Sequence, residues 1–138
     1  EADIAALDDS DGSKADLIDG SIGELSVFQE TFGYYAQGVT PSTAVLPEGW
    51  KKRLVPFHSP ATNGVTALCL EPHDLWISKA IAGRPKDAEF CLALMAHEVV
   101  LKKTLAARLG KVKNLGPARK KAVLDLIQRS AAEAGRKG

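Results

Sequence analysis

The chain has 138 residues, of which 45% are hydrophobic and 25% are charged, and its formal net charge is +1. This length and composition suffice for the core of one domain, and there is no run of about 18 apolar residues that could span a bilayer. The two cysteines, Cys69 and Cys91, exclude a disulfide framework, so we expect reduced, buried thiols in a soluble cytoplasmic protein that binds no membrane.

Charge is distributed unevenly along the chain. Residues 1–40 contain nine acidic residues and one basic residue, Lys14. Residues 100–138 contain eleven Lys or Arg residues and two acidic residues. Such asymmetry indicates either that the two ends of the chain face each other or that the basic end meets a polyanion.

The first half of the chain is expected to form short elements. Residues 1–7 are typical of a short strand, and residues 8–20 of a polar loop in which 15–19 can form a second strand. Ser21 and Glu24, in capping-box positions, predict a helix that ends at Phe32 and is followed by an aromatic strand.

A hairpin is expected next. After a single helical turn that begins near Pro47, the dipeptide Asn63-Gly64 is typical of a tight turn between two strands. The flanking apolar runs, 53–57 and 65–70, are therefore predicted to pair antiparallel.

Residues 70–90 contain the most informative pattern. Pro72 suits a first helical turn because its missing N–H has no partner there, and Gly83 is typical of the residue that ends a helix. Lys79 lies on this helix. Three polar residues follow it closely in the sequence: Arg84, Lys86 and Asp87. A lysine carried to a mixed-charge turn is one way to build a phosphate-binding site. If these side chains are exposed instead, they are only a solvated helix end, with Asp87 capping the next helix.

The last part of the chain is expected to be helical and basic. One or two helices are predicted between residues 85 and 109, and Pro117 opens the last helix. This helix begins with three basic residues: Arg119, Lys120 and Lys121. The segment 115–121 resembles half of a helix-hairpin-helix, in which backbone amides bind a DNA phosphate, but the pattern is incomplete and a plain basic amphipathic helix explains it better.

Together these elements indicate an α+β fold. We expect a small mixed or antiparallel sheet with flanking helices over residues 1–96, followed by a C-terminal basic helical segment over residues 97–138.

The run from Pro72 to Asp87, Pro-His-Asp-Leu-Trp-Ile-Ser-Lys-Ala-Ile-Ala-Gly-Arg-Pro-Lys-Asp, resembles the C-terminal signature of the nucleotidyltransferase-like superfamily. In that signature a Pro-x-Asp-Leu helix carries a lysine and is followed by Gly-Arg-x-Lys-Asp. With the segments before it, the resemblance covers roughly residues 1 to 95. It is to a bacterial branch of unknown function that is related to nucleotidyltransferase toxins of abortive-infection and toxin–antitoxin systems.

The resemblance implies transfer of a nucleoside monophosphate from a nucleoside triphosphate to an acceptor hydroxyl, with magnesium as cofactor and tRNA or a protein as acceptor. It implies catalytic roles for Lys79 and Asp87, and phosphate binding by Lys79, Arg84 and Lys86. Asp3 is the position that would bind metal, although a solvated residue in a frayed first strand is the simpler interpretation. An antitoxin or another partner chain would accompany a toxin.

One part of the superfamily pattern is missing. Catalysis in the superfamily needs a Gly-Ser loop followed by a strand that carries Asp-x-Asp, and neither Gly-Ser pair of this chain precedes such a strand. Asp9 and Asp11 have the spacing but lie in a run typical of a turn. Because the chain opens at Glu1 rather than at a methionine, we expect it to be the C-terminal part of a longer protein.

Three other interpretations of the residues stay open: a non-catalytic binding module, a subunit whose acidic N-terminal part pairs with a basic partner surface, and a zinc site. A non-catalytic module would bind nucleic acid or a partner chain through the basic C-terminal helices. A zinc site would use two thiols and two imidazoles, but no Cys-x2-Cys pair supports it. Its nominal ligands are Cys69, His73, Cys91 and His97.

Overall fold

The computed structural model describes residues 1–137. The chain divides into two compact units, Glu1–Ala44 and Val45–Gly138. The predicted boundary between residues 96 and 97 is not the boundary between these two units, and it stays a prediction.

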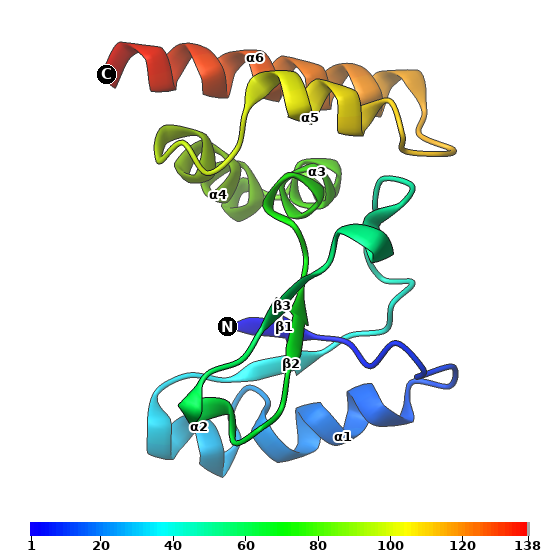
Figure 1. Ribbon diagram of the computed structural model, residues 1–138, viewed down its shortest axis with the longest axis vertical. Coiled ribbons are helices and arrows are strands. Elements are labelled where there is room, and N and C mark those ends of the chain that lie inside the picture. The colour runs from blue at the N-terminus through cyan, green and yellow to red at the C-terminus, as the bar shows by residue number, and fades with distance from the viewer. Residues whose placement is uncertain (138) are drawn as a thin grey trace. The chain divides into compact units, whose positions relative to one another are not determined.

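The first unit is built on a parallel pair of short strands with two helices between them in the sequence (Figure 1). Strand β1 (Ala2–Ile4) pairs with β2 (Ala36–Gly38), so that Asp3 lies opposite Gln37. Helix α1 (Ser13–Ile22) packs against β2, and Gly38 allows the close approach, since a Cβ there would lie 2.0 Å from the carbonyl oxygen of Ala15. Helix α2 (Val27–Phe32) is a short second helix.

Helix α1 lies where the sequence predicts a loop and a short strand, so that part of the prediction is wrong. The carboxylate of Asp9 caps the N-terminus of this helix, because it accepts hydrogen bonds from the backbone N–H groups of Lys14 and Ala15 at 3.1 and 2.9 Å. This cap comes from outside the usual N-cap position and escapes a local pattern. The predicted cap at Ser21 is also wrong, because Ser26 is the residue that caps α2.

The second unit begins with the predicted hairpin. After a 3-10 turn, η1 (Trp50–Arg53), strand β3 (Val55–Phe57) pairs antiparallel with β4 (Ala67–Cys69). A second 3-10 turn, η2 (Pro60–Thr62), lies in the connection and is followed by Asn63 and Gly64, whose φ values are 50° and 81°. The antiparallel pairing of these two strands is therefore confirmed.

Four helices form the rest of the second unit: α3 (Pro72–Ala82), α4 (Pro85–Ala96), α5 (Lys102–Leu109) and α6 (Pro117–Lys137). Helix α3 contacts α4, α5 and α6, and α5 lies alongside α6 (Figure 1). Their buried apolar residues form one core, which includes Trp76, Ile77, Cys91, Leu105 and Ile127. The basic C-terminal helices are thus part of the same packed unit as α3 and α4.

The structure confirms the α+β fold class, with one parallel and one antiparallel strand pair, flanking helices and a C-terminal helix. Of the two cysteines, Cys91 is buried as expected, but Cys69 on β4 is exposed, so the prediction of its burial is wrong. None of the helices within residues 1–137 combines the length and the apolar character needed to cross a bilayer.

Candidate functional site

The turn between α3 and α4 fixes an arginine against a buried carboxylate. Gly83 ends α3 with φ of 68°, a left-handed conformation that suits glycine, and Arg84 is the N-cap of α4. Asp87 accepts hydrogen bonds from Arg84 Nε at 2.7 Å and Nη2 at 3.2 Å, and from the Arg84 backbone N–H at 3.2 Å. The side chain of Asp87 is 3% exposed, whereas that of Arg84 is 55% exposed. The guanidinium is therefore held in one orientation at the surface.

The pKa values of two neighbouring groups, Asp87 and Cys91, reflect the positive charge at this turn. The Arg84 guanidinium, as a hydrogen-bond donor, holds the pKa of Asp87 below its usual range against the opposing effect of burial, and the charge of Lys79 acts in the same direction as Arg84. Burial raises the pKa of the Cys91 thiol to about 12, and the charge of Lys79 opposes that rise. Lys79 is therefore close enough to act electrostatically on both Asp87 and Cys91.

Arg119, which the sequence places in a separate nucleic-acid contact, lies at the same turn. A Cβ added to Gly83 would be 2.7 Å from Nη1 of Arg119. Because Gly83 has no side chain, it leaves the space that the Arg119 guanidinium occupies. The first turn of α6 and the end of α3 meet here, because both helices belong to one packed unit.

The structure places the remaining predicted residues less centrally. Lys86 is exposed in the first turn of α4, and Lys120 and Lys121 are exposed on α6. Asp3 is exposed on β1 of the first unit. The second unit thus brings Lys79, Arg84, Asp87 and Arg119 to one turn, and Asp3 belongs to the other unit.

Magnesium, which the resemblance implies, has no site made entirely of protein side chains among residues 1–137. No group of three or more His, Cys, Asp or Glu side chains within this part of the chain is arranged to hold a metal ion. Two acids of the first unit serve the backbone instead, since Asp9 caps α1 and Asp19 accepts a hydrogen bond from the Gly38 N–H at 2.7 Å. Asp3 is one carboxylate of the kind that holds Mg²⁺ together with water and substrate phosphates.

A buried charge network at the start of α3 was not predicted from the sequence. Asp74 is completely buried, and its carboxylate accepts from Arg53 Nε at 2.8 Å, from Arg53 Nη2 at 2.9 Å and from Arg108 Nη1 at 2.9 Å. Three elements, η1, α3 and α5, are therefore tied together by one carboxylate. A buried charge with this many charge-assisted donors is satisfied rather than poised to react.

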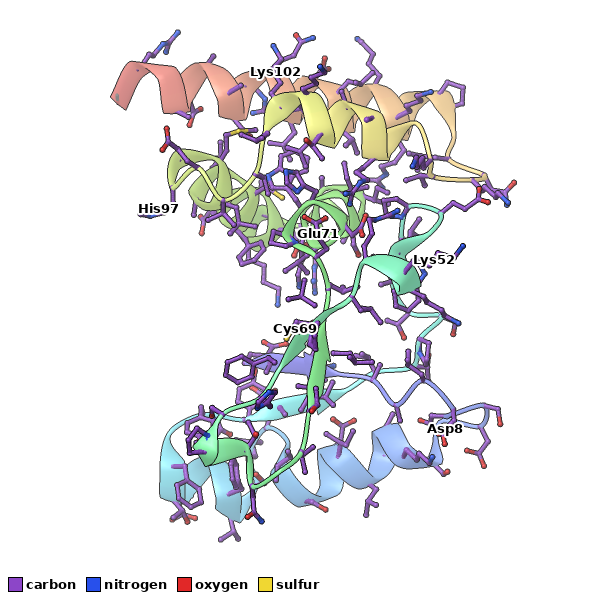
Figure 2. All side chains as sticks on the ribbon, viewed as in Figure 1. Asp8, Lys52, Cys69, Glu71, His97 and Lys102 are labelled. Carbon is purple, nitrogen blue, oxygen red and sulfur yellow. The ribbon has the colours of Figure 1, made fainter. Side chains whose placement is uncertain are left out.

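Glu71 and His73 extend this network at the N-terminus of α3. Glu71, which Figure 2 labels there, accepts a hydrogen bond from Arg108 Nη1 at 2.6 Å and lies 2.6 Å from Nδ1 of His73. Nε2 of His73 accepts from the backbone N–H of Leu101 at 2.9 Å. Burial raises the pKa of Glu71, but the hydrogen bonds from His73 and Arg108 outweigh it and lower the pKa to about 2.

One sequence signal could have found this network. Asp74 lies three and seven residues before Ile77 and Ile81, both of which are buried on the same side of α3. An acid in an apolar stripe predicts a buried, paired carboxylate. Arg53 and Arg108 are far from Asp74 in the sequence, so the spacing alone does not identify them.

A family model described as "Nucleotidyltransferase of unknown function (DUF6036)" matches residues 8–116. Because this match covers most of the chain, the protein belongs to that family. The description implies a nucleotide as the general class of substrate. Comparisons with curated proteins and with solved structures give no match.

The matched range separates the candidate residues. Lys79, Arg84, Lys86 and Asp87 lie within it, together with the buried network around Asp74. The positions outside it are Asp3 and the basic residues of α6: Arg119, Lys120 and Lys121.

Proposed function

We propose that the α3–α4 turn binds the phosphates of a nucleoside triphosphate and that the protein takes part in transfer of the nucleoside monophosphate to an acceptor hydroxyl. The observation that carries the proposal is the pair of Arg84 and Asp87. A buried carboxylate fixes the guanidinium before any ligand arrives, so less side-chain entropy is lost when a phosphate binds.

The residues of the turn divide the work. Lys79 and Arg84 supply positive charge to the phosphates, and Lys86 adds a further exposed cation from the first turn of α4. Asp87 is a positioning residue that acts through Arg84. Arg119 adds a guanidinium to the same turn.

The chemistry follows from the charges. In nucleotidyl transfer the oxygen of the acceptor hydroxyl bonds to the α-phosphorus and releases its proton to water, while the bond from that phosphorus to the pyrophosphate oxygen breaks. Negative charge grows on the departing pyrophosphate, and fixed cations stabilise it. Lys79 and Arg84 are the side chains proposed to do so. Lys79 thus serves catalysis directly, and Asp87 serves it by positioning Arg84.

Three finer assignments rest on the family resemblance. Asp3 is the carboxylate proposed to contribute to magnesium binding, although the described residues do not complete a magnesium site. A tRNA or a protein is proposed as the acceptor. A role as a toxin, held in check by an antitoxin or another partner chain in a bacterial cytoplasm, completes this proposal.

Calorimetric titration with ATP tests the phosphate site. We expect binding by the wild-type chain, and a loss of affinity of about tenfold or more in Lys79→Ala and in Arg84→Gln, because each removes one charged contact. Lys103→Ala, which removes an exposed lysine from α5, is the matched control and should bind as the wild type does. Titrations with and without magnesium measure how far the affinity depends on the ion.

Two outcomes would contradict the proposal. Binding that is unchanged in both variants would place the nucleotide elsewhere, and no binding under either condition would remove the nucleotide site from this chain. Transfer of label from radioactive triphosphates to RNA or to protein then identifies the acceptor class for a chain that binds.

A second candidate function is a non-catalytic nucleic-acid-binding module. It is favoured by the exposed, adjacent cations Lys120 and Lys121 on α6, with Arg119 beside them. Binding through phosphate contacts weakens steeply between low and physiological salt and does not require magnesium. Retention of RNA affinity in Arg84→Gln, with loss in a Lys120→Ala and Lys121→Ala double variant, would favour this module over the nucleotide site.

A further inference from the structure

Helix α2 and its flanks expose apolar side chains on the first unit. Leu25 is 93% exposed, and Phe32 and Tyr34 are 58% and 60% exposed. Phe28 contacts both rings, tilted against Phe32 at a centroid distance of 4.8 Å and edge-on to Tyr34 at 5.4 Å. We call Leu25, Phe28, Phe32 and Tyr34 the α2 patch. Clustered exposed apolar side chains of this kind mark interaction surfaces more often than scattered ones do.

The backbone holds Leu25 in an unusual position. Its φ is 64°, in the left-handed region where the Cβ of a residue crowds the following carbonyl oxygen. The side chain of Gln29 fixes this conformation by accepting a hydrogen bond from the Leu25 N–H, while Gln29 donates its own N–H to Ser26 Oγ. Leu25 is thus the residue before the N-cap of α2.

The Leu25 side chain lacks the apolar contact within α2 that usually accompanies its position. A leucine before the N-cap normally packs on the fourth residue of its helix as a hydrophobic staple. That fourth residue is Glu30, an exposed acid, so the staple cannot form. The leucine is therefore presented to solvent on a fixed backbone, which is the arrangement of an anchor for a partner.

The charge around the α2 patch restricts what can dock there. Glu24 and Glu30 are exposed beside it. The whole first unit contains nine acidic residues and one basic residue, Lys14, whose Nζ lies 2.6 Å from Asp8. Anionic lipid surfaces and nucleic acids are repelled by such a surface. A second copy bound through the same patch about a two-fold axis would bring the two acidic rims together.

We infer that the α2 patch docks a basic amphipathic helix of a partner protein. The apolar face of that helix covers Leu25, Phe32 and Tyr34, and its Lys or Arg side chains face Glu24 and Glu30. This is helix recognition by apolar anchors with a charged rim. The inference is independent of the nucleotide site, because its residues all belong to the first unit.

A synthetic amphipathic helix of leucine and lysine is the probe for this inference. Fluorescence anisotropy of the labelled peptide should show binding to the full chain, weakened about tenfold or more in Leu25→Ser and in Phe32→Ser, and weakened by Glu24→Gln with Glu30→Gln. Val65→Ser, at an exposed apolar position of the second unit, is the matched control and should bind as the wild type does. Circular dichroism and urea unfolding verify that each variant folds.

Four results would overturn the inference. Equal binding of a serine–lysine peptide would show attraction by charge alone, and equal binding of a leucine–glutamate peptide would show that the acidic rim does not matter. A large loss of stability in Leu25→Ser would show that the patch is covered within the free chain. Self-association of the wild type that Leu25→Ser abolishes would make a second copy the occupant.

Discussion

Both carboxylate oxygens of Asp87 accept hydrogen bonds from the Arg84 guanidinium, at 2.7 Å from Nε and 3.2 Å from Nη2. The carboxylate is buried and the guanidinium reaches the surface. This relationship makes Arg84 a preorganised cation at the turn between α3 and α4. The charge of Lys79 acts on the same Asp87 carboxylate, and Arg119 lies against the neighbouring Gly83.

Asp87→Asn is expected to weaken ATP binding about tenfold while the fold is kept, because Arg84 loses the charged partner that orients it. The same variant should lower the free energy of unfolding by only about 1 kcal/mol, since Asn can still accept the Arg84 backbone N–H. Calorimetry and urea unfolding measure the two effects separately. An equal change in Asp125→Asn, which alters an exposed acid of α6, would contradict a specific role for Asp87.

Asp74→Ala is expected to destabilise the protein by about 3–5 kcal/mol, because it leaves two largely buried arginines without their shared carboxylate. Those arginines are Arg53 and Arg108, whose side chains are 20% and 17% exposed. Urea unfolding followed by tryptophan fluorescence gives the value, since Trp76 lies in the same core. A loss below about 1 kcal/mol would mean that the network is not a structural tie.

Stability should fall in acid through Glu71. Its pKa in the folded protein is about 2, below the ordinary value of 4.5, so the unfolded chain takes up the proton first. The stabilisation is therefore complete above pH 4.5 and is lost as the pH falls toward 2. Urea unfolding over this range should show a smaller acid-dependent loss in Glu71→Gln than in the wild type. Parallel pH profiles of the two proteins would argue against this contribution.

The two cysteines should react at different rates. Cys69 is exposed on β4, whereas Cys91 is buried in the core and its pKa is raised to about 12 by burial, so little thiolate forms at neutral pH. A thiol reagent is expected to titrate one cysteine in the native chain and both in denaturant. Rapid modification of both in the native chain would contradict the packing of α4 against α3, where Cys91 Sγ lies 3.5 Å from the Trp76 carbonyl oxygen.

Local signals explain which parts of the fold can be predicted from the sequence. Pro72 and Gly83 mark the two ends of α3, and Asp87 caps α4 from within its first turn, so the helices and the turn between them follow from adjacent residues. The hairpin of β3 and β4 follows in the same way from its turn dipeptide.

Interactions between distant residues explain what the sequence does not reveal. Helix α1 depends on the contact of Ala15 with Gly38, and Asp74 is buried because Arg53 and Arg108, 21 and 34 residues away, pair with it. Arg119 reaches the α3–α4 turn because α6 folds back onto α3 and α4. Tertiary packing determines each of these partners, and a local sequence pattern does not contain that information.

The central claim is that the α3–α4 turn binds the phosphates of a nucleotide, and the most direct test is an NMR titration of the isotope-labelled chain with ATP. The account predicts that the largest amide shifts fall between Lys79 and Asp87 and that the guanidinium resonances of Arg84 and Arg119 move with them. Shifts confined to other regions, or no shifts at saturating ATP, would contradict it.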